Sequence, residues 1–191
     1  MAVLKRCDWS YSGNDPLYIK YHDEEWGVPL HQERKLFEFL VLEGAQAGLS
    51  WLTVLKKREN YKQALDGFNI KKIAGYDEEK IRELMGNPGI IRNRLKLDSV
   101  ILNAKCFLRI QEEFGSFDNY IWDFVPDRNP IKNRWESVSK IPSRTNESDA
   151  ISNDLHKRGL KFTGSTICYA YMQAIGMVND HITRCFRYSQ L

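Results

Sequence analysis

Residues 77–94 read DEEKIRELMGNPGIIRNR and contain the signals that decide the fold. Asp77 can cap a first helix, whose apolar residues recur at helical spacing as far as Met85. The sequence GNPG at 86–89 then predicts a tight turn, and a second helix is expected to take over at Ile90. The segment therefore predicts a helix, a hairpin turn and a second helix in succession.

The rest of the chain also has helical periodicity, with no strand-like alternation of useful length, so we expect an all-α fold. Prolines and asparagines without a sustained period predict a surface loop at 126–142. Besides the pair above, helices are expected from Pro16 to near Gly27, around Leu36–Val41, around Leu52–Leu55, at Ser116–Phe124, at Glu147–Lys157 and at Ser165–Ile175.

The composition is that of an ordinary globular protein, with 42% hydrophobic and 28% charged residues in 191. We expect a single domain at 1–191, with a central subdomain at about 60–125 and the terminal segments packed together as the second. A signal peptide and an apolar run of about 20 residues are both missing, which predicts a cytoplasmic protein without a membrane partner.

The formal net charge of +3 gives weak support for a polyanionic partner. Basic residues gather locally at 56–58 and at Arg92, Arg94 and Lys96, each group beside a turn signal. Such clusters can contact phosphates, or they can form a solvated helix face. Either interpretation fits these residues.

Four metal-binding side chains lie near the two termini. His181 and Cys185 are four residues apart, which would place both on one face of a helical turn, and Cys7 and His22 form a second pair. Two thiolates and two imidazoles prefer tetrahedral Zn²⁺, although a lone cysteine or histidine is more often a buried core residue. The remaining cysteines, Cys106 and Cys168, lie within apolar helical patterns, and His31 and His156 within polar ones. These four are not assigned as metal ligands.

Aromatic residues crowd into the first quarter of the chain, close to two polar side chains of a predicted helix. Flat rings can stack on a base, or they can simply fill the core. Glu43 lies within an apolar run, where burial of a carboxylate without a partner is costly, so a ligand or a buried donor is expected beside it. The set comprises Trp9, Tyr18, Tyr21, Trp26, Trp51, Glu43 and Gln46.

Several long motifs together resemble the type I 3-methyladenine DNA glycosylase family. They are Cys7–Trp9, YIKYHDEEWGVP at 18–29, LEGAQAGLSWLTVLKKREN at 42–60, GIIRNR at 89–94 and GSTICYAYMQAIGMVNDH at 164–181. The resemblance runs from about Lys5 to Cys185 and thins near 126–144. It implies a helix-hairpin-helix glycosylase fold and a protein that acts as a monomer.

The resemblance also implies roles for particular residues. Structural zinc is expected at Cys7, His22, His181 and Cys185, joining the terminal segments. Glu43 is expected to contact the excised base and to act in catalysis, with Tyr21 and Trp51 beside the base and Trp9, Tyr18, Trp26 and Gln46 completing the pocket. The hairpin at Gly86, Gly89, Ile91 and Arg92 is expected to anchor DNA phosphates, and Gly48 and Leu49 to enter the duplex.

The function that the resemblance implies is release of 3-methyladenine from double-stranded alkylated DNA, leaving an abasic site. Related helix-hairpin-helix enzymes place a catalytic aspartate about twenty residues beyond the hairpin, where this chain has FLRIQ at 107–111. No aspartate base is therefore assigned. Two alternatives remain: a module that binds alkylated DNA without cutting it, and a small zinc-storing or zinc-sensing protein.

Overall fold

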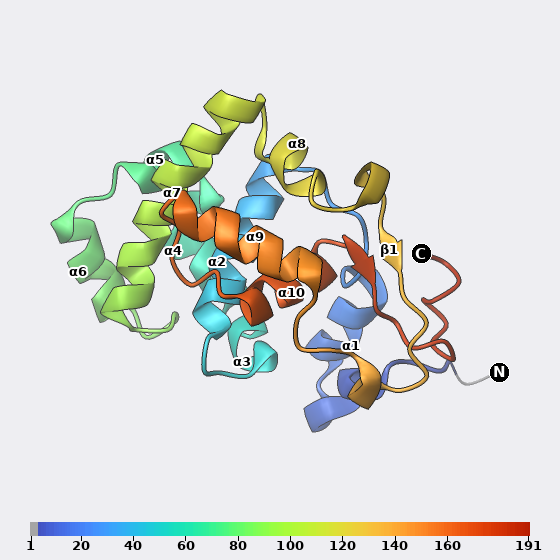
Figure 1. Cartoon of the computed structure of the whole chain (residues 1–191). Helices are drawn as coiled ribbons and strands as arrows, with labels where there is room; N and C mark the ends of the chain where they lie inside the picture. The colour runs from blue at the N-terminus through green and yellow to red at the C-terminus, as the bar shows by residue number, and fades with distance from the viewer. Residues whose placement is uncertain (1–3) are drawn as a thin grey trace.

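The computed structural model describes residues 4–191, and helices account for most of them (Figure 1). Short 3-10 segments lie at η1 (Asp8–Asn14), η2 (Asp66–Phe68), η3 (Pro126–Arg128) and η4 (Val138–Lys140), and two short strands at β1 (Ile131–Lys132) and β2 (Val178–Asn179). The α-helices are α1 (Pro16–Glu24), α2 (Glu33–Gln46), α3 (Trp51–Leu55), α4 (Arg58–Ala64), α5 (Ile70–Ala74), α6 (Glu78–Gly86), α7 (Arg94–Phe114), α8 (Phe117–Trp122), α9 (Asn146–Lys157) and α10 (Ser165–Ala174).

The helix, turn, helix pattern of 77–94 is present as α6, a turn and α7, but α7 begins later than expected. The Asp77 side chain accepts a hydrogen bond from the Lys80 N–H and caps α6 as predicted. The expected start of the second helix at Ile90 is wrong. Asn93 is the cap, accepting from the Lys96 N–H, so the helix begins at Arg94 and the apolar residues before it belong to the turn.

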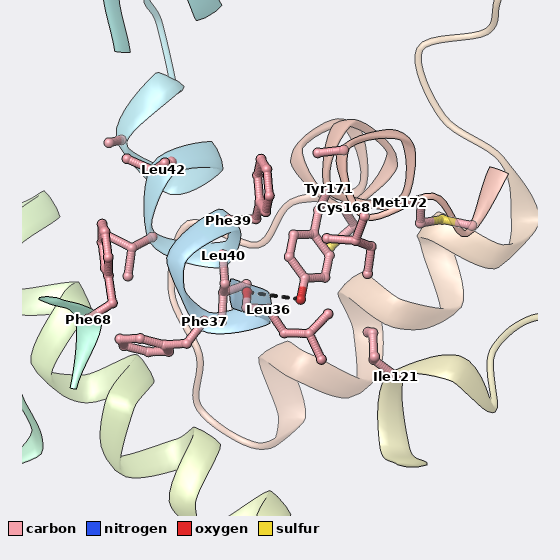
Figure 2. Close-up of a cluster of buried hydrophobic side chains, with 14 of the residues drawn as sticks. Leu36, Phe37, Phe39, Leu40, Leu42, Phe68, Ile121, Cys168, Tyr171 and Met172 are labelled. Carbon is pink, nitrogen blue, oxygen red and sulfur yellow. Dashed lines mark hydrogen bonds between the residues drawn. The ribbon is translucent and has the colours of Figure 1, made fainter. Parts of the chain in front are cut away.

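The core is centred on α2, which is buried on almost every side from Leu36 to Ala45. Figure 2 shows its apolar side chains between Phe68 on one side and α10 on the other. The buried Tyr171 hydroxyl donates to the Leu36 carbonyl oxygen at 3.1 Å and joins α10 to α2. A helix that is buried all round brings whatever polar side chains it carries into the interior, and Glu43 is one of them.

The predicted loop at 126–142 is more ordered in its backbone than expected. It contains η3, β1 and η4, and β1 pairs in parallel with β2, with Ile131 opposite Val178 and Lys132 opposite Asn179. The reason is the burial of β2, whose backbone polar groups need partners away from water. The sequence carries too few residues in either strand to predict this pairing by alternation.

The end of α10 lies close against the segment that follows α1. The Gly27 N–H donates to the Gln173 carbonyl oxygen and the Leu30 N–H to that of Ile175, both at 3.0 Å. Gly176 makes this approach possible: its φ is +74°, and a Cβ atom there would lie 2.3 Å from the Val28 carbonyl carbon. Within residues 4–191, the structure has no helix with the length and apolar character needed to cross a membrane.

Candidate functional site

A cavity of about 360 Å³ opens between the N-terminal segments, α2 and α10. All seven residues singled out in the sequence as a base pocket line it, from η1, α1, the segment after α1, α2 and α3. The complete lining is Trp9, Tyr18, Tyr21, Trp26, Glu43, Gln46, Trp51, Val138, Ile141, Pro142, Ser143, Thr166, Tyr169, Ala170 and Gln173.

Rings in mutual contact form the aromatic part of the wall. The Trp9 ring centroid lies 5.0 Å from that of Tyr18 and 4.9 Å from that of Trp26, and the Tyr21 centroid lies 5.3 Å from that of Trp51. These tilted and edge-on pairs favour one another electrostatically and fix the rings against rotation. The wall is therefore a rigid, largely apolar surface of the kind that accommodates a flat heterocycle.

Glu43 is the carboxylate of this cavity, and its side chain has unused hydrogen-bonding capacity. The residue is 3% exposed, and its Oε2 has no hydrogen-bonding partner among the described residues. Burial raises the pKa of its carboxyl group from 4.5 to about 8, because the charged form loses its hydration. Trp51 Nε1 is a second buried polar atom without a partner in the same part of the chain, and it belongs to the same wall.

The sequence prediction missed the other half of the lining. Val138, Ile141, Pro142 and Ser143 come from the stretch predicted as an uninformative loop. Thr166, Tyr169, Ala170 and Gln173 come from α10, and their spacing places them on one helix face. That spacing was a usable signal, whereas nothing in the sequence indicated which side of the predicted loop would face inward.

Asp180, which the sequence prediction also missed, holds this second wall in place. It is 1% exposed and accepts four hydrogen bonds. Tyr169 Oη donates at 2.6 Å and Gln173 Nε2 at 2.7 Å from α10, while Asn133 Nδ2 donates at 2.7 Å and Trp135 Nε1 at 2.8 Å from the segment before η4. A buried carboxylate with this many donors is fully satisfied, in contrast to Glu43.

The four predicted metal ligands form one buried cluster, with their ligand atoms all within 4.8 Å of one another. Cys185 Sγ lies 3.5 Å from both His22 Nε2 and His181 Nδ1, and Cys7 Sγ lies 3.6 Å from His181 Nδ1. A tetrahedral zinc ion holds thiolate sulfur and imidazole nitrogen about 3.5 Å apart, given its usual bond lengths. The arrangement therefore fits a four-coordinate metal ion with no position left for water.

The outer nitrogens of both histidines are also engaged, which orients the rings toward the cluster. His181 Nε2 donates to the Trp26 carbonyl oxygen at 3.0 Å, and His22 Nδ1 lies 2.8 Å from Asp23 Oδ1. The expectation that His181 and Cys185 share a helical turn is wrong. Residues 181–185 form irregular turns, and the Cys185 N–H donates to the Ile182 carbonyl oxygen instead of to that of His181.

The turn predicted to enter a duplex is exposed. Gly48 has a φ of +77° with open space where a side chain would be, and Leu49 is 42% exposed. Within the hairpin, two of the residues expected to anchor phosphates use their backbone N–H groups inside the protein. The Gly89 N–H donates to Asn87 Oδ1 at 2.8 Å and the Ile91 N–H to Tyr61 Oη at 3.2 Å, so phosphate contact there would need these bonds to be shared or exchanged.

The basic clusters divide into paired and exposed side chains. Arg58 bonds to Glu25 and Glu38, and Arg94 bonds to Glu78 and Asp98, so these two arginines are already neutralised within the protein. Arg92 is exposed on the hairpin. The structure therefore reduces the set of cations at the hairpin that are free to meet a phosphate.

Comparison with known proteins identifies similar proteins over nearly the whole length of the chain. The family model described as methyladenine glycosylase matches residues 9–188. The DNA-3-methyladenine glycosylase 1 of Escherichia coli is 48% identical over 185 residues, covering 97% of each chain.

Solved structures agree with this relationship. A crystal structure of 3-methyladenine DNA glycosylase I is 52% identical, with a TM-score of 0.91 over 95% of this chain and 98% of that one. A Staphylococcus aureus structure that describes 3-methyladenine recognition is 34% identical, with a TM-score of 0.91 and coverage of 97% of both chains. At these identities and coverages, sequence and fold are shared along 95–97% of this chain.

Proposed function

The chain belongs to the methyladenine glycosylase family, and we infer that it is a DNA-3-methyladenine glycosylase. It hydrolyses the N-glycosidic bond of 3-methyladenine in alkylated double-stranded DNA, releases the free base and leaves an abasic site. The observation that carries this function is a buried, unpartnered Glu43 carboxylate in a cavity walled by aromatic rings.

The cavity complements a cationic purine. Methylation at N3 gives the adenine ring a positive charge, which attracts the faces of aromatic rings. Beside that charge the pKa of the Glu43 carboxyl group, raised by burial in the substrate-free protein, falls again, so a bound cationic base favours the ionised carboxylate. Glu43 Oε2 is free to accept a hydrogen bond from an exocyclic amine, and Trp51 Nε1 is free to donate one to a ring nitrogen. A base that leaves these two buried groups unpaired is disfavoured, which is the source of selectivity.

The chemistry requires little assistance to the leaving group. Cleavage of the bond between sugar carbon and base nitrogen returns its electron pair to the purine, whose positive charge is thereby neutralised. A water oxygen bonds to the sugar carbon and gives up a proton to the surrounding solvent. Glu43 recognises and orients the base for this step, and the rings hold it after it has been flipped out of the duplex.

DNA contacts belong to the exposed turn and the hairpin. Leu49, presented by Gly48, enters the space that the flipped base has left. The hairpin meets the backbone phosphates through Arg92 and through the backbone at Gly86, Gly89 and Ile91. On contact with a phosphate, the Gly89 and Ile91 N–H groups share or exchange their bonds to Asn87 and Tyr61. These assignments are supported by exposure of Leu49 and Arg92 in the structure and by the family relationship.

The metal of the Cys7, His22, His181 and Cys185 cluster is zinc with a structural role. Two thiolates and two imidazoles at tetrahedral spacing are a donor set that zinc prefers, and all four positions are filled by protein. Bound there, the ion supplies a cross-link between the terminal segments and takes no part in the hydrolysis.

The decisive experiment is to incubate methylated duplex DNA with the protein and to look for free 3-methyladenine by chromatography. Wild-type protein should release it, and Glu43→Gln should lose most of the activity while still folding. Glu59→Gln makes the same chemical change on an exposed side chain of α4 and should release base at the wild-type rate. A protein that shifts the mobility of the DNA and releases no base would be a binding module, and the proposed function would be wrong.

A further inference from the structure

Lys96 is a buried cation that the proposed chemistry does not use. It lies in the first turn of α7, is 9% exposed, and does not line the cavity. Its Nζ donates to the Ala45 carbonyl oxygen at 2.8 Å and to the Ala47 carbonyl oxygen at 2.7 Å. Among residues 4–191 it has no carboxylate partner, which is unusual for a buried ammonium group.

The two carbonyl groups that accept from Lys96 lie where α2 ends and the turn to α3 begins. Carbonyl groups in the last turn of a helix have no partners within the helix, and they form its negative end. In this turn, the Leu49 N–H reaches back to the Gln46 carbonyl oxygen at 2.6 Å, and Gly48 adopts a φ of +77°. The Lys96 ammonium group therefore stabilises the turn by donating to the carbonyl groups of the residues before and after Gln46.

The position of Lys96 in the chain connects this turn to the hairpin. Lys96 follows Asn93, the cap of α7, and the hairpin at 86–92 precedes that cap directly. The first turn of α7 is therefore connected to two segments. The hairpin precedes it directly in the chain, and the Lys96 side chain bonds to the turn at 45–49. The hydrogen bonds of Lys96 therefore join the turn at 45–49 to the start of the helix that directly follows the hairpin.

Stability of the fold alone gives little reason for a charge at this place. Burial lowers the pKa of the Lys96 ammonium group, because its charged form loses hydration without gaining a carboxylate. A methionine has nearly the same length and would fill the space without that desolvation cost. What methionine could not do is hold two carbonyl groups in one orientation.

We propose that Lys96 is a positioning residue that locks the turn at 45–49 against the start of α7. Leu49 and the hairpin are thereby kept at a fixed separation, so that both can contact a duplex from which one base has been flipped out. The proposal rests on the function inferred above. In it, Lys96 affects how the protein binds the duplex, whereas the cavity recognises the base.

The test compares Lys96→Met with Lys105→Met, which removes the same charge from an exposed position on the same helix, about 13 Å farther along it. Three quantities are measured: single-turnover release of 3-methyladenine from methylated duplex, affinity for free 3-methyladenine, and amide hydrogen exchange at Gly48 and Leu49. For Lys96→Met, we expect release to fall about 10- to 100-fold and exchange to rise about tenfold. Free-base affinity should stay within about threefold, and Lys105→Met should resemble wild type in all three.

Three results would overturn the proposal: wild-type release by Lys96→Met, unchanged exchange at Gly48 and Leu49, or a loss of free-base affinity as large as its loss of release. If Lys96→Met does not fold, Lys96→Gln takes its place, since an amide can still donate to one carbonyl; it should give an intermediate loss of release and an intermediate rise in exchange. Failure of the proposed function is recognised separately, because wild-type protein would then release no base. In that case, unchanged exchange at Gly48 and Leu49 in the variant would still refute the positioning role.

Discussion

Substitution of Glu43 by glutamine should stabilise the substrate-free protein, increasingly so as the pH rises. In the folded protein, burial raises the pKa of Glu43 to about 8 from an ordinary value of 4.5. The folded state therefore holds this proton more tightly than the unfolded state does. The resulting stability is fully present below pH 4.5 and is lost as the pH rises to about 8, where folded Glu43 ionises.

The size of the effect follows from the same two values. Each unit of pKa difference corresponds to about 1.4 kcal/mol, so wild-type protein should lose about 3 kcal/mol relative to the variant between pH 4 and pH 7. By pH 9 the relative loss should reach about 5 kcal/mol, as an upper limit. For a chain of this length, about 1 kcal/mol corresponds to 2–4 °C in melting temperature.

The assay is urea unfolding of both metal-loaded proteins at pH 5, 7 and 9, followed by tryptophan fluorescence. Other titrating groups are shared, so they cancel in the difference between the two free energies of unfolding. Any pH-independent packing effect of the glutamine amide shifts the difference by a constant. A difference that stays constant from pH 5 to pH 9 would show that Glu43 is not desolvated, and the account of the cavity would fail.

Two further predictions concern the framework around the cavity. Purified protein should contain about one equivalent of tightly held zinc per chain. Cys185→Ser should lose the zinc and melt at a lower temperature, whereas the control Cys106→Ser should retain it. Equal zinc contents in the two variants, measured by metal analysis, would contradict the ligand set. Gly176→Ala should cost about 3 kcal/mol or more in urea unfolding, because its Cβ would meet the Val28 backbone, whereas Gly67→Ala, with a φ of +63° and open space, should cost only about 1–2 kcal/mol. Equal losses in the two alanine variants would show that the backbone around Val28 yields to the added atom.

Helix boundaries could be predicted wherever a local signal decides them. Ser116 caps α8 through its side chain, and Gly159, with a φ of +96°, follows the end of α9, both as expected from the sequence. The helix expected at Ile90 was predicted from apolar residues alone, whereas in the structure Asn93 is the cap of α7. The cap decided the outcome, since the N–H groups of the first helical turn need an acceptor.

The candidate site was predictable only where its residues crowd together in the sequence. Trp9, Tyr21 and Trp51 attract attention by density, and Glu43 by its apolar neighbours. Val138 and Ile141 have no such signal, because their inward placement depends on a segment that β2 and Asp180 hold against the rest of the protein. The unsatisfied state of Glu43 is also a property of its surroundings, and no residue type predicts it.

The sequence by itself determined a helical fold, the hairpin between α6 and α7, and the two Cys and His pairs with their spacing. Only the tertiary structure decided that Cys7 and His22 meet His181 and Cys185 in one buried cluster, and that Lys96 reaches the end of α2. Periodicity and caps act over a few residues, because they depend on hydrogen bonds between near neighbours. Contacts between distant segments depend on how the whole chain buries its apolar surface, which no single stretch specifies.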